Sequence, residues 1–300
     1  MGHIVRKKRQ AGKFLGFCFS LYNGAIVKEQ KLIFTVLFIF SVIIGLFLGL
    51  RYGVPFPAEF PNANAIPVKQ AAVRSPVKVP IAIYHSVRPY IKGESAEQDR
   101  YDITPELLAK HIKYIKDNGY TAISFDALAD YFDEGKPLPV KPIILSFDDS
   151  WRNQYLYAFP LLTKEKITAT FFVFTNSLNH GNHLSWDEVR DMKKAGMEIG
   201  SHTKFHPYLD NIASPTILAA EVSGSKTILE ESIGTPITAF AYPFGEHGTT
   251  TVAEVKRAGY RIARAIRGGN IQSADDRYAL RGFIVSDDFK EFVRIIKNEK

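Results

Sequence analysis

The sequence predicts an α/β protein: a distorted (β/α) barrel of about seven parallel strands, preceded by one N-terminal transmembrane helix. Short apolar runs alternate with helical patterns from Pro80 onward, and such nearly all-apolar strands are typical of a parallel sheet covered on both faces. Seven or eight strand–helix units over roughly 220 residues fit a closed barrel better than an open sheet. An uncharged apolar run occupies residues 32–50.

The apolar run from Leu32 to Leu50 contains 19 residues without a charge. As a helix it spans roughly 28 Å, close to the hydrocarbon thickness of a bilayer. A cleaved signal peptide has a shorter apolar stretch followed closely by a small-residue cleavage site; the nearest candidate, NANA at 62–65, lies well beyond the run. We therefore predict an uncleaved, single-pass signal anchor in the cell membrane, with a cleaved signal as the alternative.

Positive charge is confined to the N-terminal part of the chain. The first 51 residues hold eight Lys or Arg and one Glu, whereas the other 249 hold 30 basic and 30 acidic residues. This asymmetry argues against a nucleic-acid-binding surface on the domain. The basic residues before the apolar run predict a cytoplasmic N-terminus and a domain on the extracytoplasmic side. The only cysteine is Cys18, so the exported part is expected to fold without disulfides.

Four segments follow from these patterns. Residues 1–31 form a basic cytoplasmic segment and residues 32–50 form the anchor. Residues 51–78 are rich in proline and without periodicity, which predicts a semi-extended spacer. Residues 79–300 form the folded domain.

Within the domain, eight apolar runs are predicted strands: 81–87, 121–125, 142–149, 169–175, 197–203, 237–244, 260–266 and 279–285. The helices between them have recognisable starts. Thr104-Pro105 and Ser214-Pro215 each pair an N-cap residue with proline at the first helical position, and Ser185 with Glu188 is a capping box. Gly119 and Gly196 fit the left-handed position that ends a helix.

Side chains that can bind a metal ion or transfer a proton stand at the ends of three of these strands. Asp148 and Asp149 end one strand, His202 and His206 end another, and His85 ends the first. In a parallel barrel the active site lies at these C-terminal strand ends. Two histidines and one carboxylate are a ligand set of catalytic zinc, with cobalt or nickel as alternatives. The second carboxylate can then act as a general base on water.

At these residues the sequence resembles the polysaccharide deacetylases, carbohydrate esterases that share the chitooligosaccharide-deacetylase homology domain. SFDDS at 146–150 is similar to the family's first motif and HTKFH at 202–206 to its second. The resemblance implies that Asp148 is the general base. It implies that Asp149, His202 and His206 bind the divalent metal.

The third family motif is altered in this chain. It corresponds to AYPFG at 241–245, where Ala241 stands in place of an arginine that holds the base. We expect Arg281 to substitute for that arginine. The backbone N–H of Phe244 corresponds to the family's oxyanion donor. Ser150 replaces a glycine of the first motif.

The first strand, VPIAIYHSV, is similar to the family branch that deacetylates poly-N-acetylglucosamine. In that branch the acid histidine comes from the start of the domain, which makes His85 the expected general acid; the alternative is a structural histidine closing the strand. The resemblance implies removal of N-acetyl groups from poly-N-acetylglucosamine, peptidoglycan or a chitin-like polymer. A non-catalytic polysaccharide-binding or scaffolding protein on the same fold remains the alternative function.

Overall fold

The computed structural model describes residues 75–94 and 101–297. The predicted cytoplasmic segment, the anchor at 32–50 and nearly all of the spacer lie outside these residues. Within the described part, no helix combines the length and apolar character needed to cross a membrane. That finding therefore does not concern the segment predicted to be the anchor.

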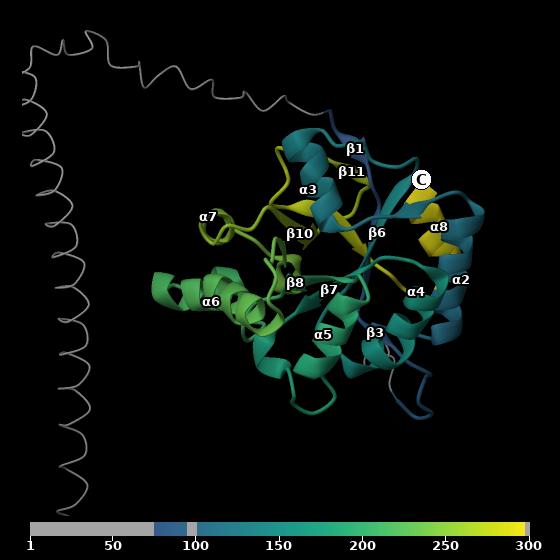
Figure 1. Cartoon of the computed structure of the whole chain (residues 1–300), viewed down its shortest axis with the longest axis horizontal. Helices are drawn as coiled ribbons and strands as arrows, with labels where there is room; N and C mark the ends of the chain where they lie inside the picture. The colour runs from purple at the N-terminus through teal and green to yellow at the C-terminus, as the bar shows by residue number, and fades with distance from the viewer. Residues whose placement is uncertain (1–74, 95–100, 298–300) are drawn as a thin grey trace, which may run out of the picture. The chain divides into compact units, whose positions relative to one another are not determined.

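Seven parallel strands form a closed ring, as the sequence predicts (Figure 1). In ring order these strands are β2 (Ile81–Tyr84), β12 (Leu280–Ile284), β10 (Ile262–Ile266), β9 (Ala239–Ala241), β8 (Glu198–Ser201), β7 (Thr170–Val173) and β6 (Pro142–Phe147). The ring closes because β2 also pairs in parallel with β6, with Ile81 opposite Ile144. An eighth short strand, β5 (Thr121–Ala122), extends the sheet beside β6.

Helices surround the ring and cover its outer face (Figure 1). They are α2 (Pro105–Asp117), α4 (Phe159–Glu165), α5 (Trp186–Lys194), α6 (Pro215–Ile233), α7 (Thr249–Arg257) and α8 (Phe289–Lys297). The predicted starts are confirmed: Thr104 and Ser214 each accept a hydrogen bond from the first helical turn, and Ser185 with Glu188 forms a capping box. Gly119 and Gly196 adopt φ values of 72° and 91°, the left-handed region predicted for them.

One helix has a different position. Helix α3 (Phe125–Glu134) closes the N-terminal end of the barrel, where Phe125 and Leu128 pack against interior residues of the strands. The buried carboxylate of Glu198, at the start of β8, accepts hydrogen bonds from the backbone N–H groups of Phe125 and Asp126. In Figure 1, α3 lies at one end of the barrel and β3 (Ser86–Val87) at the other. The open end is therefore the one where the strands finish.

Small pairings complete the domain. β1 (Val77–Lys78) pairs antiparallel with β11 (Ile271–Gln272), so the folded domain includes two residues assigned to the spacer. β3 pairs in parallel with β4 (Asp102–Ile103) beside the open end. A π-helical turn, η2 (Gln154–Ala158), leads into α4.

Candidate active site

The three predicted ligands meet at the open end of the barrel. Asp149 Oδ1 lies 3.2 Å from His206 Nε2 and 3.5 Å from His202 Nε2. One ligand atom from each of the three side chains falls within 4.8 Å of the others. Two imidazoles and a carboxylate at this spacing could hold a divalent metal ion.

Hydrogen bonds fix the orientation of both imidazoles. His202 Nδ1 lies 2.8 Å from the carbonyl oxygen of Ala241, and this contact turns Nε2 toward Asp149. The backbone N–H of His206 donates to Thr203 Oγ1 at 2.9 Å. Outer contacts of this kind are typical of ligating histidines, because they select the tautomer and the ring orientation.

A buried glutamate that was not among the predicted site residues supports the same loop. Glu221, on α6, accepts hydrogen bonds from the backbone N–H groups of Lys204 and Phe205, at 3.0 Å and 2.9 Å. Its side chain is only 5% exposed. A glutamate on a helix carries no sequence signal that links it to a loop 16 residues earlier.

The three ligands are also coupled electrostatically. Burial alone would raise the pKa of Asp149, but hydrogen bonds and charge from His202 and His206 outweigh it and hold that pKa well below its usual range. The carboxylate is therefore ionised across the physiological pH range. An ionised carboxylate is the form that binds a cation.

The second carboxylate, Asp148, is paired with an arginine inside the barrel. Arg264 Nη2 lies 2.7 Å from Asp148 Oδ1 and 2.6 Å from Oδ2, and the two side chains are 0% and 2% exposed. The guanidinium also lies over the ring of Phe172, 5.2 Å from its centre. Asp148 is thus held by a buried, doubly hydrogen-bonded ion pair.

The prediction that Arg281 holds Asp148 is wrong. Side chains alternate between the two faces of a strand, and on β12 the neighbours Leu280 and Gly282 face the barrel interior. Arg281 therefore points outward, where it is 37% exposed and lies 3.6 Å from Asp276. The arginine that does reach Asp148 is on β10.

Strand register explains how Arg264 can occupy this place. Arg264 of β10 is the direct register partner of Ala241 on β9, the position where the resembling family carries its arginine. Because neighbouring residues in register point to the same face of the sheet, a guanidinium can enter from either strand. One sequence signal could have identified Arg264: it is a charged residue at an inward position of the predicted strand RIARAI, residues 261–266.

His85 lies beside the cluster at the end of β2. Its Nδ1 atom is buried and has no hydrogen-bond partner among the described residues. Burial lowers the pKa of His85, and the charges of Asp148 and Asp149 act in the opposite direction. Gln154 links the ends of β2 and β6. Its Nε2 donates to the carbonyl oxygens of His85 at 2.6 Å and Asp148 at 2.5 Å.

Backbone strain is concentrated around the cluster. Five of the non-glycine residues with positive φ stand in or next to the predicted motifs: Asp149 (71°), Ser150 (60°), Thr203 (72°), His206 (59°) and Phe244 (60°). Such conformations cost about 1–3 kcal/mol each and persist where the surrounding structure enforces them. The strain here positions two of the ligands and the peptide at Phe244.

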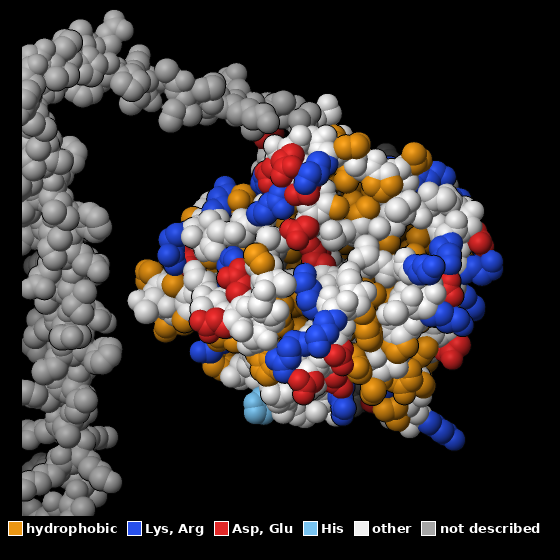
Figure 2. Space-filling view, viewed as in Figure 1, with side chains coloured by type: hydrophobic (Ala, Val, Ile, Leu, Met, Phe, Trp, Pro, Cys, Tyr) orange, Lys and Arg blue, Asp and Glu red, His pale blue; other side chains and the backbone are white. Residues whose placement is uncertain are grey.

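A groove of about 700 Å³ opens next to the cluster. Asp149 and His85 are among its lining residues, and the others come from β3 and the segment after it at 88–94, from residues 101–102, from residues 151–157 and from the loop at 181–182. Exposed apolar side chains follow β3 or precede α4: Tyr90, Ile91, Leu156 and Tyr157. Figure 2 shows hydrophobic surface gathered beside α4 and β3. The groove is therefore continuous with the ligand cluster and partly apolar.

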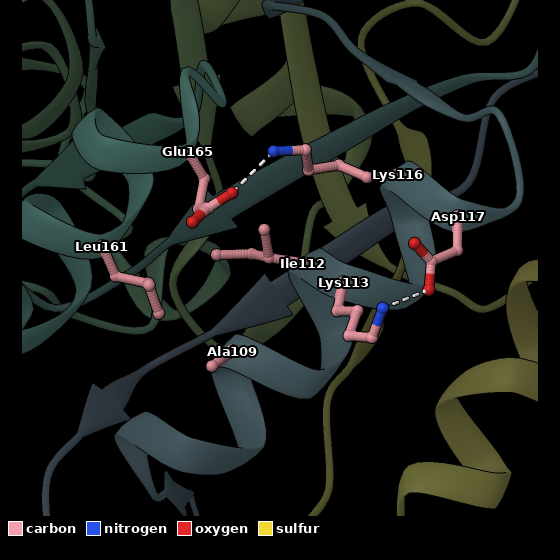
Figure 3. Close-up of a pocket in the computed structure, with 7 residues that line it drawn as sticks. All are labelled: Ala109, Ile112, Lys113, Lys116, Asp117, Leu161 and Glu165. Carbon is pink, nitrogen blue, oxygen red and sulfur yellow. Dashed lines mark hydrogen bonds and ion pairs between the residues drawn. The ribbon is translucent and has the colours of Figure 1, made fainter.

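A second hollow, of about 380 Å³, lies between α2 and α4 (Figure 3). The ion pair between Lys116 and Glu165, 2.6 Å apart, crosses it. No strand end contributes to its lining. Its ionic groups are paired with each other, so it is a surface depression between helices and not a catalytic centre.

Comparison with known proteins agrees with this geometry. Residues 135–263, which include Asp148, Asp149, both histidines and Phe244, match the polysaccharide deacetylase family. Over these residues the chain is similar to that family.

Its relatives include solved structures. The Streptococcus pyogenes deacetylase PplD, determined in complex with acetate, is 27% identical, with a TM-score of 0.69 over 74% of this chain and 99% of that chain. The polysaccharide deacetylase BC0361 of Bacillus cereus is 28% identical, with a TM-score of 0.65 over 74% and 69% of the two chains. The poly-beta-1,6-N-acetyl-D-glucosamine N-deacetylase of Staphylococcus aureus is 25% identical over 71% of this chain and 80% of its own length. These comparisons support a polysaccharide deacetylase activity for this chain.

Proposed function

We propose that this enzyme is a metal-dependent hydrolase that removes N-acetyl groups from N-acetylglucosamine units of an extracytoplasmic polysaccharide. The proposal depends on one observation. The carboxylate of Asp148, which is held by the buried Arg264, lies next to the Asp149–His202–His206 cluster at the open end of the barrel. A groove of about 700 Å³ leads to this point.

The residues present fit a divalent metal ion. Asp149 is ionised, and the Nδ1 contact of His202 leaves its Nε2 directed at the cluster. We assign the ligand role to Asp149, His202 and His206, with zinc as the expected ion and cobalt or nickel as alternatives. When bound, the ion supplies Lewis-acid chemistry, acidifying water and polarising the acetamide carbonyl.

The chain's own groups carry the proton transfers. Asp148 accepts a proton from the attacking water, and the Arg264 ion pair keeps its carboxylate in place. The Phe244 backbone N–H donates to the oxyanion that forms as water adds to the carbonyl. His85 delivers a proton to the leaving amine nitrogen. Since burial lowers the pKa of His85, the proton taken up at Asp148 is the proposed source of the one that His85 transfers. The products are acetate and a glucosamine unit.

The relatives support the substrate class. The Staphylococcus aureus relative is named for poly-beta-1,6-N-acetyl-D-glucosamine, and the Streptococcus pyogenes relative binds acetate. We therefore propose poly-N-acetylglucosamine as the first substrate to test, with peptidoglycan and chitin fragments beside it. The apolar run at 32–50 and the basic residues before it support a membrane anchor with the catalytic domain outside.

Acetate release tests the proposal. Purified enzyme is stripped of metal with a chelator, restored with zinc, and assayed on all three polymers. We expect no acetate from the stripped protein and release from at least one polymer after restoration. Equal release with and without metal would contradict the metal dependence. Polymer binding without any acetate release would favour the scaffolding alternative.

The role of His85 has its own test. A general acid contributes about 100- to 10,000-fold when the leaving group is poor, so His85→Ala should reduce acetamide hydrolysis by a factor in that range. Hydrolysis of p-nitrophenyl acetate should fall much less, because nitrophenolate leaves without a proton. Equal losses on both substrates would return His85 to a structural role.

A further inference from the structure

The pairing of β2 with β6 ends just before the proposed acid and the proposed base. Tyr84 and Phe147 are the last paired residues of the two strands, and the backbone N–H of Asp148 donates to the carbonyl oxygen of Tyr84 at 2.9 Å. The next carbonyl oxygens, those of His85 and Asp148, lie beyond the paired residues. Buried carbonyl groups without a ladder partner need another donor.

One buried glutamine amide supplies the donor for both carbonyls. Gln154 is the first residue of η2 and is 0% exposed. The hydrogen bonds from its Nε2 to the carbonyl oxygens of His85 and Asp148 replace the missing ladder contacts. The amide therefore continues the link between β2 and β6 at the two residues to which the proton transfers are assigned.

The adjacent side chain holds the rest of the segment after β2. Asn153 Nδ2 donates to Ser86 Oγ at 2.7 Å, and Asn153 Oδ1 accepts from the backbone N–H of Val87 at 3.2 Å. Two neighbouring amides thus bind three consecutive residues, beginning with His85. A π-helical turn such as η2 is rare and frequently lies at a functional site. Here it fixes the segment that carries the proposed acid.

The proposed acid depends on this link more than the proposed base does. Asp148 has a second support, because Arg264 forms two hydrogen bonds with its carboxylate. The imidazole of His85 is held less firmly: its buried Nδ1 has no partner among the described residues, and its ring contacts that of Tyr101 at 4.9 Å between centres. Loss of the Gln154 amide should therefore displace His85 more than Asp148.

We propose that Gln154 is a positioning residue that keeps the imidazole of His85 within reach of the leaving nitrogen. This inference rests on the proposed function and deepens it. Gln154 is buried, so it acts through the backbone of His85 and not on the substrate. A general acid must lie within hydrogen-bond reach of the atom that it protonates, and a misplacement of about 1 Å can cost about 100-fold in rate.

A comparison of two leaving groups tests the inference. Zinc-loaded full-length protein is assayed on N-acetylglucosamine oligomers, whose amine leaves with a proton, and on p-nitrophenyl acetate, whose leaving group needs none. Gln154→Met keeps the length of the side chain and removes the donor. We expect kcat on the oligomers to fall about 10- to 100-fold with KM unchanged, and ester hydrolysis to fall less than about 3-fold, because it does not need the acid.

A double-mutant cycle shows whether the effect passes through His85. In a His85→Ala background, Gln154→Met should cause little further loss on the oligomers, since the group that it positions is already absent. A further loss as large as in the wild-type background would overturn the inference. Full oligomer activity in His85→Ala itself would remove the acid assignment, and the inference with it.

Gln272 provides a matched control at the other end of the same strand. It is 1% exposed, and its Nε2 donates to the carbonyl oxygens of Val79 and Arg281, both at 2.9 Å. It therefore links the segment before β2 to β12, far from His85 along the strand. Gln272→Met should lower the melting temperature as Gln154→Met does, but the ratio of oligomer to ester activity should stay at the wild-type value.

The outcomes distinguish positioning of the acid from general support of the barrel. Equal losses on both substrates in Gln154→Met, or the same change of ratio in Gln272→Met, would overturn the inference. Should Gln154→Met not fold, Gln154→Glu replaces it, because a neutral carboxyl group still donates one hydrogen bond. Its loss should be smaller but again confined to the oligomers, and equal losses on both substrates would overturn the inference there too.

The proposed function can fail separately from the positioning role. If no sugar substrate releases acetate, the proposed function fails by itself. The placement of His85 is then measured by its rate of modification with diethyl pyrocarbonate, followed by mass spectrometry. A rate raised in Gln154→Met but not in Gln272→Met supports the positioning role, and equal rates in the two variants overturn it.

Discussion

At the scale of single residues, the ion pair between Asp148 and Arg264 determines what the site can do. Both side chains are essentially inaccessible to water, and Arg264 Nε and Nη1 have no hydrogen-bond partner among the described residues. Burying two charges costs several kcal/mol each, which their attraction recovers only when the geometry is good. A pair retained under these conditions is weak evidence of a stabilising role. Its role is better understood as orienting Asp148, the proposed catalytic base.

Removing the arginine should damage both stability and turnover. Arg264→Met leaves an uncompensated carboxylate inside the barrel, so the free energy of unfolding should fall by about 3 kcal/mol or more. Acetate release should fall at least 100-fold because the base loses its position. Denaturant titration and an acetate assay measure the two effects. As a control, Arg281→Ala removes a partly exposed pair and should change stability by less than about 1 kcal/mol; a larger loss there would contradict the assignment.

Metal content should distinguish the proposed role of Asp148 from that of the ligand cluster. Asp148→Asn keeps an oxygen for Arg264 and leaves the ligands untouched, so the folded protein should keep its metal and lose activity. His206→Ala removes a proposed ligand and should remove most of the metal. Metal content by mass spectrometry, on protein shown to be folded by circular dichroism, reports both. Loss of metal from Asp148→Asn would show that the roles of the aspartates are reversed.

The cluster of Asp149, His202 and His206 could be predicted from the sequence because each residue lies in a short motif at a strand end. Asp149, His202 and His206 needed no long-range information beyond the rule that the C-terminal ends of parallel strands meet. Arg264 and Glu221 could not be found in this way. Their partners are 116 and 16 or 17 residues away, and strand register or helix packing brings them together.

At the scale of elements, helix α6 holds the loop that carries both histidines. Glu221→Ala removes the acceptor for two backbone N–H groups, which should loosen the loop and weaken zinc binding by about 10- to 100-fold, the usual cost of losing an outer support. Competition with a chromogenic chelator measures the affinity. Glu231→Ala, at an exposed position of the same helix, is the matched control and should leave the affinity unchanged. Equal zinc affinities in both variants would mean that the loop keeps its conformation without Glu221.

Packing between α2 and α8 makes stability depend on pH. His111 of α2 is buried, stacks on Phe292 of α8 with ring centres 3.9 Å apart, and contacts the Tyr84 hydroxyl at 3.3 Å. Burial lowers its pKa from 6.5 to about 3. Between these values the unfolded chain binds a proton that the folded chain does not, so stability falls as the pH drops from 6.5 toward 3. The slope from this group is at most about 1.4 kcal/mol per pH unit.

A His111→Gln variant isolates this contribution. It should be less stable than the wild type at pH 7.5, because the ring packing is lost, yet its stability should fall less steeply between pH 6 and pH 4. Urea titrations at several pH values give the two slopes. Parallel curves for the two proteins would show that another group causes the acid sensitivity.

The barrel strands and the helix starts could be predicted because each has a local cause. Apolar runs specify buried parallel strands, and Thr104, Ser185 and Ser214 can cap a helix without tertiary contacts. The run 121–125 is an exception, because the sequence predicts a strand throughout. Only Thr121 and Ala122 are a strand, and Phe125 instead begins α3. Ser124 caps that helix, and Glu198 from a distant strand accepts hydrogen bonds from its first N–H groups.

At the scale of the whole molecule, positive charge is concentrated in the first 51 residues. The part of the chain after residue 51 has equal numbers of acidic and basic residues, so it has no overall attraction to nucleic acids or anionic lipids. Deacetylation gives the polymer a positive charge at each glucosamine. A neutral enzyme is expected to release such a product more readily than a strongly acidic one would.

The membrane orientation is the last prediction. Seven basic residues precede the apolar run at 32–50, whereas Arg51 alone follows it closely, so the N-terminus should remain in the cytoplasm and Lys300 should lie outside. A reporter that is active only in the cytoplasm should be inactive when fused after Lys300 and active when fused before Met1. Replacing the seven preceding basic residues with glutamine should weaken this preference, because the positive charges set the orientation. Strong activity of the fusion after Lys300 in the unmodified protein would refute the orientation. A mature N-terminus near residues 63–66 would show instead that the anchor is cleaved.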